Sequence, residues 1–307
     1  MPKTKLLIIG YSSFARRRLI PSLKRNKKFN YCICSKSKKI NNKIKIFYNN
    51  YQTALRKFRP NIVYISTINS LHLSYAKKIL KMGFNVIVDK PITLDLKSTI
   101  NLLKIAKRKK LFLAESTLYN YHRVFKIIEK ECEGIKNIQL IKSDLNHPLV
   151  SSLKRIKKIK GDCEDDMAVY ASTIIRLFMK NKINNLTVDR NYFKNSKLVK
   201  NFYVKNNSKN CTYFGNFAMD REYSQQIIFY TKSKIIFSPQ RIFALPYKDL
   251  EIIVKTKNKF KKIKVKKDDC INNFFKKVLY SLKRRKYDFF YKTLLQDGKN
   301  RDIINNS

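Results

Sequence analysis

Short apolar runs alternate with stretches of helical period through the first third of the chain. Five runs have the length and composition of buried strands: Leu6–Ile9, Tyr31–Cys34, Ile62–Ile65, Val86–Val88 and Leu111–Ala114. Apolar residues at helical spacing predict helices in the remaining stretches: 19–23, 51–58, 71–80 and 96–107. Because crossover helices connect parallel strands, this part of the chain predicts an α/β domain with a doubly wound parallel sheet.

The pattern changes after about residue 122. Helices are expected near 124–132 and 167–179, with a strand over 138–142. Four β-rich runs with short connections predict neighbouring antiparallel strands: Tyr213–Met219, Gln225–Thr231, Lys234–Phe237 and Leu250–Lys255. Closing helices are expected over 268–286 and 288–296. The sequence thus predicts two domains, a doubly wound, mononucleotide-type domain over 1–122 and an α+β domain with antiparallel strands over 123–307.

The charge of the chain is unusual. Its 68 Lys and Arg against 21 Asp and Glu give a formal net charge of +47, which suggests nucleic acid or an anionic membrane as a partner. Only 16 of these cations are Arg, the side chain that reads phosphate bidentately, and the Lys accompany abundant Asn and Ile. AT-rich codons supply Lys, Asn and Ile. We therefore expect that the lysine excess reflects drift of genome composition rather than a specific nucleic-acid or membrane partner. Nucleic-acid binding ranks last, and it predicts an affinity that falls steeply with salt.

The six cysteines do not form a recognisable framework. They are scattered, without a CxxC pair or histidines at zinc spacing, so neither disulfides nor a metal is expected: Cys32, Cys34, Cys132, Cys163, Cys211 and Cys270. The amino-terminal apolar run lacks a small-residue cleavage pattern, and no stretch has the roughly 18 apolar residues of a membrane span. These features predict a cytoplasmic protein.

The first strand ends at a turn with dinucleotide-binding spacing. Gly10-Tyr11-Ser12-Ser13-Phe14-Ala15 stands where G-x-G-x-x-G is expected, with Ser12 and Ala15 in place of the second and third glycines. Ala satisfies the third position, which requires only close helix–strand packing. Ser12 is a departure at the position where the backbone approaches a pyrophosphate. Taken alone, the turn is equally compatible with an ordinary strand-to-helix connection.

The end of the second strand indicates which dinucleotide is bound. An NAD-binding domain places Asp or Glu here to accept a hydrogen bond from the ribose 2′-hydroxyl. The chain instead has Ser35-Lys36-Ser37-Lys38, whose hydroxyls and cations suit a 2′-phosphate. The sequence therefore favours NADP, with NAD as the alternative.

The following strand ends complete an ordered set of motifs. Val63-Tyr64-Ile65-Ser66-Thr67-Ile68-Asn69-Ser70-Leu71-His72, followed by Gly83 and Asp89-Lys90-Pro91, resembles the Gfo/Idh/MocA oxidoreductase family. That family has a strand, T-P-N-x-x-H, a helix and E-K-P, and here Ile68 replaces the proline and Asp89 the glutamate. Similarity continues in four blocks: Glu115–His122, Gly161–Tyr170, Asp220–Tyr223 and Arg241–Pro246.

Within the family, three features most resemble NADP-dependent ketoreductases that act on nucleotide-linked deoxysugars. These are Arg16-Arg17-Arg18 with Pro21, the Ser-Lys-Ser turn, and Tyr rather than His at position 170. In the block Gly161–Tyr170, which resembles the family's substrate segment G-G-x-x-x-D-x-G-x-[HY], Asp162 and Ala168 replace glycines. The resemblance implies that residues 1–122 form a dinucleotide-binding (Rossmann) domain and that residues 123–307 form an α+β domain with an open, mainly antiparallel sheet. It also implies a substrate site at the junction of the two domains and a homo-oligomer formed through the carboxy-terminal sheet.

The resemblance also implies roles for individual residues. Lys90 is the expected acid/base beside the nicotinamide and the substrate oxygen, Tyr170 is the second acid/base candidate, and Asp166 holds sugar hydroxyls or orients the other two. Residues expected to contact the cofactor are Gly10, Ser12, Ser13, Phe14, Ser35, Lys36, Ser37, Ser66, Thr67, Asn69, His72, Asp89 and Lys90. Without the resemblance, His72 and His122 would be interpreted as core histidines.

Physical chemistry supports these roles. Hydride delivery to a ketone builds negative charge on oxygen, so the site needs a cation or acid about 3 Å from that atom. Lys90 follows a strand at the sheet edge where such folds bind ligands, and it is the candidate cation that makes Tyr170 a better proton donor. Asp166 and Tyr170 are four residues apart and share a helix face. No histidine accompanies the nearby acids Asp162, Glu164 and Asp165. Acidic residues are favoured in a loop that leads into the start of a helix, so this position accounts for them better than a metal site does.

The sequence thus predicts an NADP-dependent reductase of a ketosugar, carried on a nucleotide and used in surface-polysaccharide or glycoside synthesis. Two alternatives remain open. One is a catalytically idle binding protein of the same fold, which the departures at Ser12, Ile68, Asp89 and Ala168 keep in consideration. The other is an NAD-dependent polyol or sugar dehydrogenase of the same family.

Overall fold

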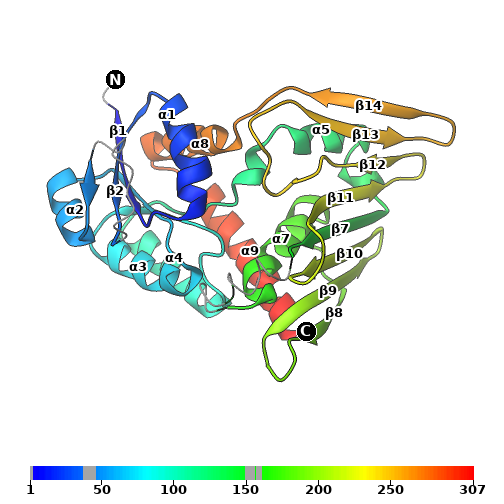
Figure 1. Ribbon diagram of the computed structural model, residues 1–307, viewed down its shortest axis with the longest axis horizontal. Helices are drawn as coiled ribbons and strands as arrows, with labels where there is room; N and C mark the ends of the chain where they lie inside the picture. The colour runs from blue at the N-terminus through cyan, green and yellow to red at the C-terminus, as the bar shows by residue number, and fades with distance from the viewer. Residues whose placement is uncertain (1–2, 37–45, 149–155, 157–160) are drawn as a thin grey trace. The chain divides into compact units, whose positions relative to one another are not determined.

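The chain is divided into two units, each assembled from two separate segments. The computed structural model describes every residue except 1–2, 37–45, 149–155 and 157–160. Unit 1 comprises Met1–Thr117 and Phe274–Leu295, and unit 2 comprises Leu118–Asn273 and Gln296–Ser307 (Figure 1). Both units therefore include residues close to the carboxyl end, and the consecutive domains 1–122 and 123–307 stay a prediction.

Unit 1 is built on a six-stranded sheet in which every neighbouring pair is parallel. The spatial order is β3-β2-β1-β4-β5-β6, which is the order of a dinucleotide-binding sheet made of two mononucleotide-binding halves. The strands are β1 (Thr4–Ile9), β2 (Phe29–Cys34), β3 (Phe47–Tyr48), β4 (Ile62–Ile65), β5 (Asn85–Val88) and β6 (Leu113–Glu115). This confirms the predicted doubly wound sheet.

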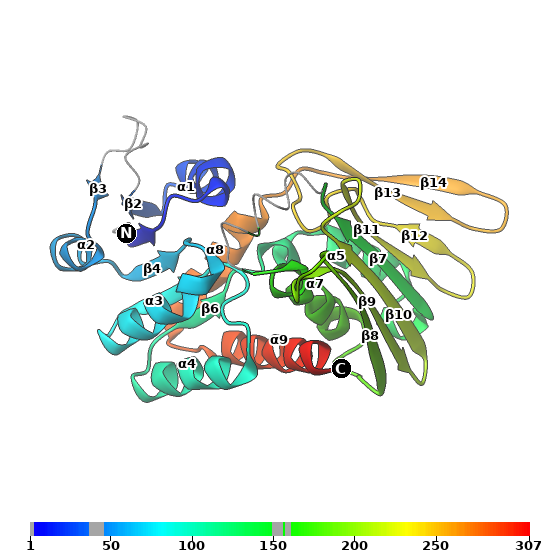
Figure 2. The same cartoon turned by 60° about the horizontal axis from the view of Figure 1, so that its bottom comes forward.

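Helices cover both faces of this sheet. The helices α2 (Tyr51–Phe58), α3 (Asn69–Lys81) and α4 (Leu96–Arg108) lie beside this sheet (Figure 2). Alternate strand residues such as Leu7 and Ile9 join the core shared with these helices. On the opposite face, Phe275 of α8 (Cys270–Arg284) packs edge-on against Phe29, with ring centroids 4.9 Å apart. A further helix, α9 (Asp288–Asn306), follows α8 and contributes residues to both units.

The connection after β1 is irregular. It begins with a short π-helix, η1 (Ala15–Leu19), and continues as α1 (Ile20–Arg25), which has Pro21 in its first turn. Proline has no N–H, so Pro21 cannot complete a helical hydrogen bond to the turn before it. The apolar pattern at Leu19, Ile20 and Leu23 thus predicted the position of this helix but not its π-type start.

Unit 2 is built on an eight-stranded sheet with the order β14-β13-β12-β11-β7-β10-β9-β8. All neighbouring pairs are antiparallel except β7–β10, so the predicted open, mainly antiparallel sheet is confirmed. The strands are β7 (Leu140–Asn146), β8 (Asn185–Tyr192), β9 (Val199–Ser208), β10 (Cys211–Ala218), β11 (Ser224–Tyr230), β12 (Ile235–Phe237), β13 (Leu250–Lys255) and β14 (Phe260–Val265).

One expectation about this sheet was wrong. The runs now seen as β10 and β11 were predicted to be neighbours, but β7 lies between them, antiparallel to β11 and parallel to β10. The intervening strand is about 70 residues earlier in the sequence, so turn length alone does not reveal it. The successive pairs β11–β12 and β12–β13 are antiparallel neighbours, as predicted.

Helices α5 (Val124–Glu131) and α7 (Cys163–Phe178) contribute to one apolar core with the sheet of unit 2. Phe178 packs against Phe229 with ring centroids 4.7 Å apart, and Phe202 stacks on Phe217 at 4.8 Å. Two short 3₁₀ helices flank α5, namely η2 (Leu118–Tyr121) and η3 (Ile135–Asn137). This core holds α7, which carries the candidate residues of unit 2.

All six cysteines are buried as free thiols, in agreement with the expectation of no disulfide framework. Burial raises the pKa of Cys32 to about 12 and that of Cys34 to about 11. In the part of the chain that the structure describes, no helix has the length and apolar character needed to cross a membrane.

Candidate active site

The turn after β1 brings the first glycine of the dinucleotide motif against the end of β4. Gly10 has φ +99°, and a Cβ at this position would lie 2.2 Å from the carbonyl oxygen of Ser66. Both the positive φ and the close approach exclude other side chains here. Backbone hydrogen bonds fix the turn, with Gly10 N–H donating to Cys34 O at 2.8 Å and Ser66 N–H donating to Ile9 O at 2.7 Å.

Ser12 occupies the second position of the motif. Its hydroxyl oxygen accepts a hydrogen bond from the Ala15 N–H at 3.0 Å and lies 2.7 Å from the hydroxyl of Ser66. Ala15 is fully buried, which agrees with close packing at the third position. Ser13 and Phe14 are half-buried between them. The motif therefore keeps its geometry at positions one and three and gains a side-chain contact at position two.

The end of β2 is described only in part. Ser35 N–H donates to Tyr48 O at 3.0 Å, so the residue after β2 is fixed to the end of β3. Lys36 is exposed. Ser37, the third residue expected to bind a 2′-phosphate, lies outside the described residues.

The end of β4 and the start of α3 hold four of the expected cofactor residues. Ser66 is buried, and Thr67 and Asn69 are half-buried. The amide nitrogen of Asn69 is shielded from solvent and has no hydrogen-bond partner in the described structure, so it is a donor available to a ligand. His72 Nδ1 lies 2.7 Å from Pro91 O and its Nε2 lies 3.3 Å from Thr67 O, so its ring joins two backbone segments.

Asp89 receives three hydroxyl groups from the neighbouring strands. Its Oδ1 accepts from Tyr64 at 2.5 Å and from Ser116 at 3.1 Å, and its Oδ2 accepts from Ser66 at 2.6 Å. Tyr64 is fully buried, and burial followed by the charge of Asp89 raises its pKa well above the ordinary value. The phenol therefore remains a donor to the carboxylate. Together with Ser12, these residues form one hydroxyl–carboxylate network along the carboxyl edge of the sheet.

The segment that carries Lys90 is held on three sides. Asp89 N–H donates to Ile65 O at 2.9 Å, and Ile92 N–H donates to Glu115 Oε1 at 2.7 Å. The Lys90–Pro91 peptide is cis, and the Pro91 carbonyl faces the ring of His72. Lys90 itself is half-buried. The backbone on both sides of this lysine is thus anchored to β4, to the residue that ends β6 and to α3.

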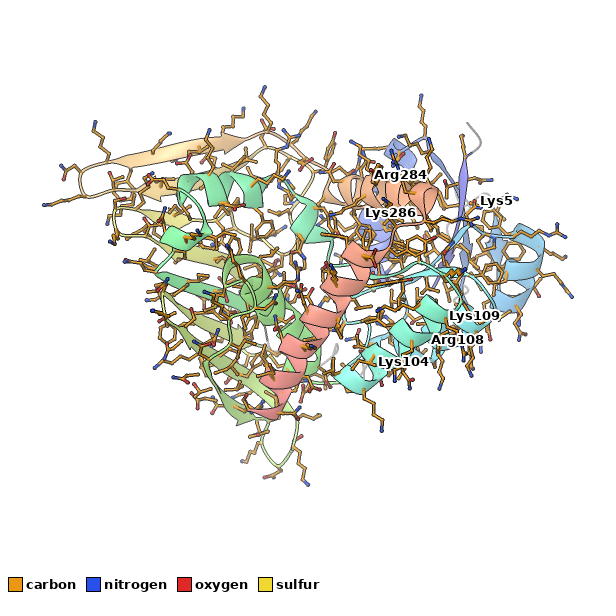
Figure 3. The ribbon with its side chains drawn as sticks, turned by 180° about the vertical axis from the view of Figure 1, so that it is seen from behind. Lys5, Lys104, Arg108, Lys109, Arg284 and Lys286 are labelled. Carbon is orange, nitrogen blue, oxygen red and sulfur yellow. The ribbon has the colours of Figure 1, made fainter. Side chains whose placement is uncertain are left out.

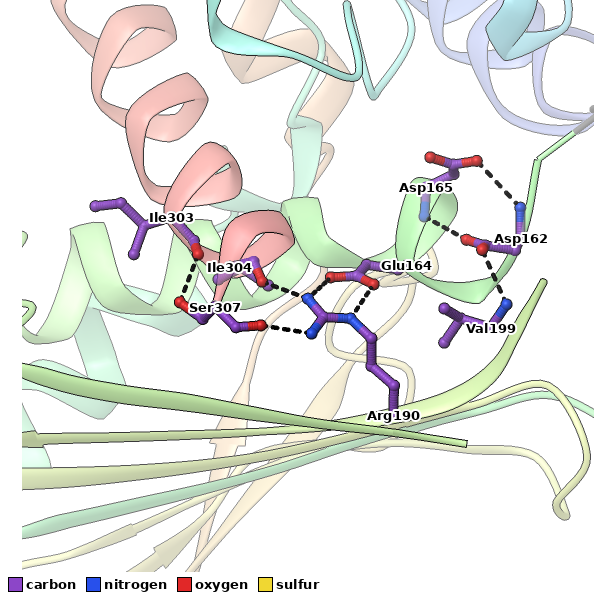
Figure 4. Close-up of polar contacts among 8 residues, drawn as sticks. All are labelled: Asp162, Glu164, Asp165, Arg190, Val199, Ile303, Ile304 and Ser307. Carbon is purple, nitrogen blue, oxygen red and sulfur yellow. Dashed lines mark hydrogen bonds and ion pairs between the residues drawn. The ribbon is translucent and has the colours of Figure 1, made fainter. Parts of the chain in front are cut away.

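In unit 2, α7 begins at Cys163, four residues before the predicted helix over 167–179. Its first turns thus lie within Gly161–Tyr170, the block that resembles the family's substrate segment. Asp162 caps the helix by accepting from Asp165 N–H at 3.0 Å, and its own N–H donates to Asp165 Oδ2 at 3.2 Å, which completes a capping box (Figure 4). A carboxylate at the helix start satisfies otherwise unpaired N–H groups. Burial, followed by the charge of Asp162, raises the pKa of Asp165 to about 6.

Glu164 in the same first turn of α7 is paired rather than available to a ligand. Arg190 of β8 donates to both of its oxygens, each at 2.7 Å, and also to the carbonyl oxygens of Ile304 at 2.7 Å and Ser307 at 2.6 Å (Figure 4). The hydrogen bonds to Glu164 raise the pKa of Arg190. The hydrogen bonds of Asp162, Glu164 and Asp165 make this acidic segment a helix cap and an ion pair.

Asp166 and Tyr170 lie one turn apart on α7, as their spacing predicted. Asp166 is 2% exposed, whereas Tyr170 is half-buried. The rings of Tyr170, Phe243 and Tyr119 form one cluster. The Tyr170 centroid lies 4.6 Å from that of Phe243 and 5.5 Å from that of Tyr119, and the latter two centroids are 5.3 Å apart. Packing within this cluster restricts the Tyr170 ring.

Burial lowers the pKa of His122, and its Nδ1 accepts from Val124 N–H at 3.1 Å. This contact agrees with the interpretation of His122 as a core histidine. His147 precedes Pro148, and its ring lies 5.5 Å from that of Tyr223.

The structure adds residues that the sequence interpretation did not assign. Tyr64, Ser116 and Glu115 complete the surroundings of Asp89 and Lys90, and Phe243 with Tyr119 surrounds Tyr170. A signal for Tyr64 existed, because a tyrosine within a fully buried parallel strand must find a partner for its hydroxyl. Lys90 belongs to unit 1, and Tyr170 and Asp166 belong to unit 2.

Comparison with protein families agrees with the motif analysis. A model described as an oxidoreductase family with an NAD-binding Rossmann fold, GFO_IDH_MocA, matches residues 4–116. The matched range covers β1 through β6 and includes the turn at Gly10 and the segment at Lys90. The resemblance predicted from the strand-end motifs is thereby confirmed.

Two curated relatives match part of the chain. The dTDP-3,4-didehydro-2,6-dideoxy-alpha-D-glucose 3-reductase of Streptomyces violaceoruber is 23% identical over 137 residues, covering 43% of this chain and 40% of the relative. The trans-1,2-dihydrobenzene-1,2-diol dehydrogenase of Danio rerio is 21% identical over 128 residues, covering 40% of this chain and 38% of the relative. The aligned region thus spans about two fifths of each relative.

The fold is similar over the full length to a solved ketoreductase. KijD10, a 3-ketoreductase from Actinomadura kijaniata crystallised with NADP and TDP-benzene, superposes with a TM-score of 0.88 at 16% identity. The superposition covers 99% of this chain and 97% of that structure. At this identity the likeness establishes the fold of both units.

Proposed function

From the match of residues 4–116 to the Gfo/Idh/MocA oxidoreductase family model, we propose that the chain is an NADP-dependent reductase of a ketosugar. The observation that carries the proposal is the carboxyl edge of the unit 1 sheet. There the positive-φ turn at Gly10, the unpartnered amide of Asn69 and the anchored Lys90 segment follow neighbouring parallel strands. Ligands bind at this edge in doubly wound sheets.

The residues of unit 1 fit a nicotinamide dinucleotide. The absent Cβ of Gly10 lets the turn approach Ser66, and Asn69 supplies an unpaired donor at the start of α3. Ser35, Lys36 and Ser37 are proposed to hold a 2′-phosphate, and Ser12, Ser13, Phe14, Thr67 and His72 to line the remaining cofactor surface. Bound NADPH would supply the hydride, with NADH as the alternative donor.

Lys90 is proposed to stabilise and protonate the substrate oxygen as negative charge develops there. Its support is the three-sided anchoring of the flanking backbone, which fixes the strand end that carries the ammonium group. Tyr170 is proposed as the second proton donor, oriented by Phe243 and Tyr119. Asp166, one turn earlier on α7, is proposed to accept hydrogen bonds from sugar hydroxyls.

The proposed substrate is a keto group on a nucleotide-linked deoxysugar. The Streptomyces relative is a reductase of a dTDP-linked deoxysugar, and the Actinomadura structure contains a TDP ligand with NADP. A place in surface-polysaccharide or glycoside synthesis, a cytoplasmic location and a homo-oligomeric state belong to the same proposal. The second candidate is an NAD-dependent polyol or sugar dehydrogenase. The match to the Danio rerio diol dehydrogenase supports the dehydrogenase part of this alternative.

The first test is parallel titration of NADPH and NADH, followed by nicotinamide fluorescence in about 0.3 M salt, where the Debye length is about 6 Å. Saturable binding with NADPH preferred supports the cofactor assignment. Binding of neither would contradict the reductase proposal and leave a binding protein of the same fold.

Turnover then tests Lys90. Across a panel of dTDP-ketosugars, Lys90→Ala is expected to lower kcat by about 10²- to 10⁴-fold, which is the usual contribution of a positioned acid. The matched control is Lys97→Ala, which removes an exposed lysine from the first turn of α4. Equal loss in both variants, or none in Lys90→Ala, would show that Lys90 does not carry the chemistry.

A further inference from the structure

The proton positions in the network around Asp89 are determined by its chemistry. A carboxylate only accepts hydrogen bonds, so the Ser66 hydroxyl donates its proton to Asp89 Oδ2 over 2.6 Å. That proton is then unavailable to Ser12, so at the 2.7 Å contact between the two serine hydroxyls Ser12 must be the donor. The Ser12 oxygen simultaneously accepts from the Ala15 N–H. The Ser12 hydroxyl is thus oriented by a carboxylate that it does not contact.

This chain of hydrogen bonds links two parts of the proposed site. Ser12 stands at the turn position where the backbone approaches a pyrophosphate in dinucleotide-binding folds. Asp89 directly precedes Lys90, and both the Ser66 and Tyr64 side chains that hold it are buried to 1% exposure or less. Water is therefore a poor substitute for either donor, and loss of one link leaves the next hydroxyl without its partner.

Building on the proposed function, we propose that Asp89 sets the affinity of the cofactor turn through Ser66 and Ser12. Ser12 and Ser66 are then positioning residues. Ser12, which replaces the second glycine of the motif, contributes hydrogen bonds that a glycine could not make. When Asp89 accepts from Ser66, Ser12 holds the turn in one conformation for the dinucleotide. When that acceptor is removed, the Ser66 proton is free, Ser12 loses its fixed orientation, and the turn must be ordered by the cofactor itself.

A double-mutant cycle on cofactor binding tests this coupling without depending on turnover. Ser12→Ala, Asp89→Asn and the double variant are titrated with NADPH by nicotinamide fluorescence, in the full-length chain. Each single variant is expected to raise the Kd about 5- to 20-fold, a common range for coupled sites. The double variant is expected to raise it no more than the larger single effect. A double effect equal to the product of the two single effects would overturn the proposal.

Three controls separate positioning from general damage. Asp95→Asn removes another acid of unit 1, which caps α4 by accepting from Ser98 N–H at 2.6 Å, and its effect must be independent of Ser12→Ala. Ser12→Thr keeps the hydroxyl and is expected to restore the coupling to Asp89. If Asp89→Asn does not fold, Ser66→Ala replaces it in the cycle, because it removes the middle link.

The possible failures are distinguishable. If the unchanged protein binds neither NADPH nor NADH, the proposed function fails and this inference fails with it. If the unchanged protein binds NADPH and the cycle is additive, only the coupling through Ser66 is wrong.

Discussion

The two units use their carboxylates in different ways. Unit 1 contains 34 Lys and Arg but only four acids, namely Asp89, Asp95, Glu115 and Asp288, whereas unit 2 contains 34 Lys and Arg with 17 acids. In unit 1, Asp89, Asp95 and Glu115 accept from hydroxyl or backbone N–H groups. In unit 2, acids such as Asp297 and Glu164 pair with Arg176 and Arg190.

Unit 1 therefore presents a surface of exposed cations. Figure 3 shows six of them on or next to β1, α4 and α8: Lys5, Lys104, Arg108, Lys109, Arg284 and Lys286. The unit assigned to an anionic cofactor is thus the more strongly positive of the two. The excess charge of unit 1 acts as a long-range field that salt screens. Asp89 and Glu115 instead fix local geometry at the sheet edge, and Asp95 does so at the start of α4.

The largest loss of stability is expected when the buried ion pair of unit 2 is broken, since unit 2 pairs its acids with arginines. Arg176 Nε lies 2.7 Å from Asp297 Oδ1, with side-chain exposures of 12% and 1%. Burial lowers the pKa of Arg176, but Asp297 outweighs this and raises it overall. Asp297→Ala leaves the guanidinium charged and buried, so the free energy of unfolding is expected to fall by about 3–5 kcal/mol in urea titrations.

The matched control for that variant is Glu251→Ala. Its partner Lys262 lies 3.8 Å away, and both side chains are more than 60% exposed. The change in stability is expected to stay within the error of the measurement. Similar losses at the two sites would mean that ion pairing does not distinguish the core of unit 2 from its surface.

An intermediate effect is expected from Asp165. Its pKa is raised from 3.8 to about 6, so between these values the folded protein binds more protons than the unfolded chain. Stability should therefore fall as the pH rises from about 4 to about 6. Relative to Asp165→Asn, the wild-type chain is expected to lose roughly 1–3 kcal/mol over this window.

The measurement is the free energy of unfolding of both proteins at half-unit steps from pH 4 to 7. Titrating groups remote from Asp165 contribute equally to the two curves, so the difference reports Asp165 together with the carboxylates that interact with it, Asp162 first. Parallel curves would contradict the raised pKa.

The smallest effect concerns the surface charge itself. Lys104 and Arg108 are like charges four residues apart on α4, so Lys104→Glu converts a repulsive pair into an attractive one. It is expected to stabilise the chain by about 0.5–1 kcal/mol in 0.05 M salt and to have little effect in 1 M salt, where the Debye length is about 3 Å. The reversal Lys262→Glu in unit 2 breaks a pair instead and should not stabilise. Equal responses in both units would remove the distinction between them.

The fold of unit 1 was predictable because buried parallel strands are continuous apolar runs. Its missed strand, β3, has only two residues, too few for any periodicity. In unit 2 the sequence analysis missed β8, β9 and β14, and the two edge strands β8 and β14 are largely exposed and carry many polar residues. The insertion of β7 between β10 and β11 depends on pairing between distant segments, which local patterns do not encode.

The candidate site was predictable where a motif marks the end of a strand, as at Gly10, Ser66 and Asp89. It was not predictable where the partner comes from the interior of another strand or from a loop. Tyr64 contacts Asp89 because the register of β4 and β5 places them together. Phe243 contacts Tyr170 because of the path that the chain takes after β12. The sequence thus identified candidate residues at the strand ends, and the structure supplied the side chains that contact them.

The discontinuous make-up of the units has a consequence for biosynthesis. The sheet of unit 1 is complete by residue 115, but the helix that covers one of its faces begins only at Cys270. The centre of the unit 2 sheet likewise waits for β10 and β11 to join β7. A nascent chain therefore exposes apolar sheet surface until its last third leaves the ribosome, and both units are expected to complete their folding late and nearly together.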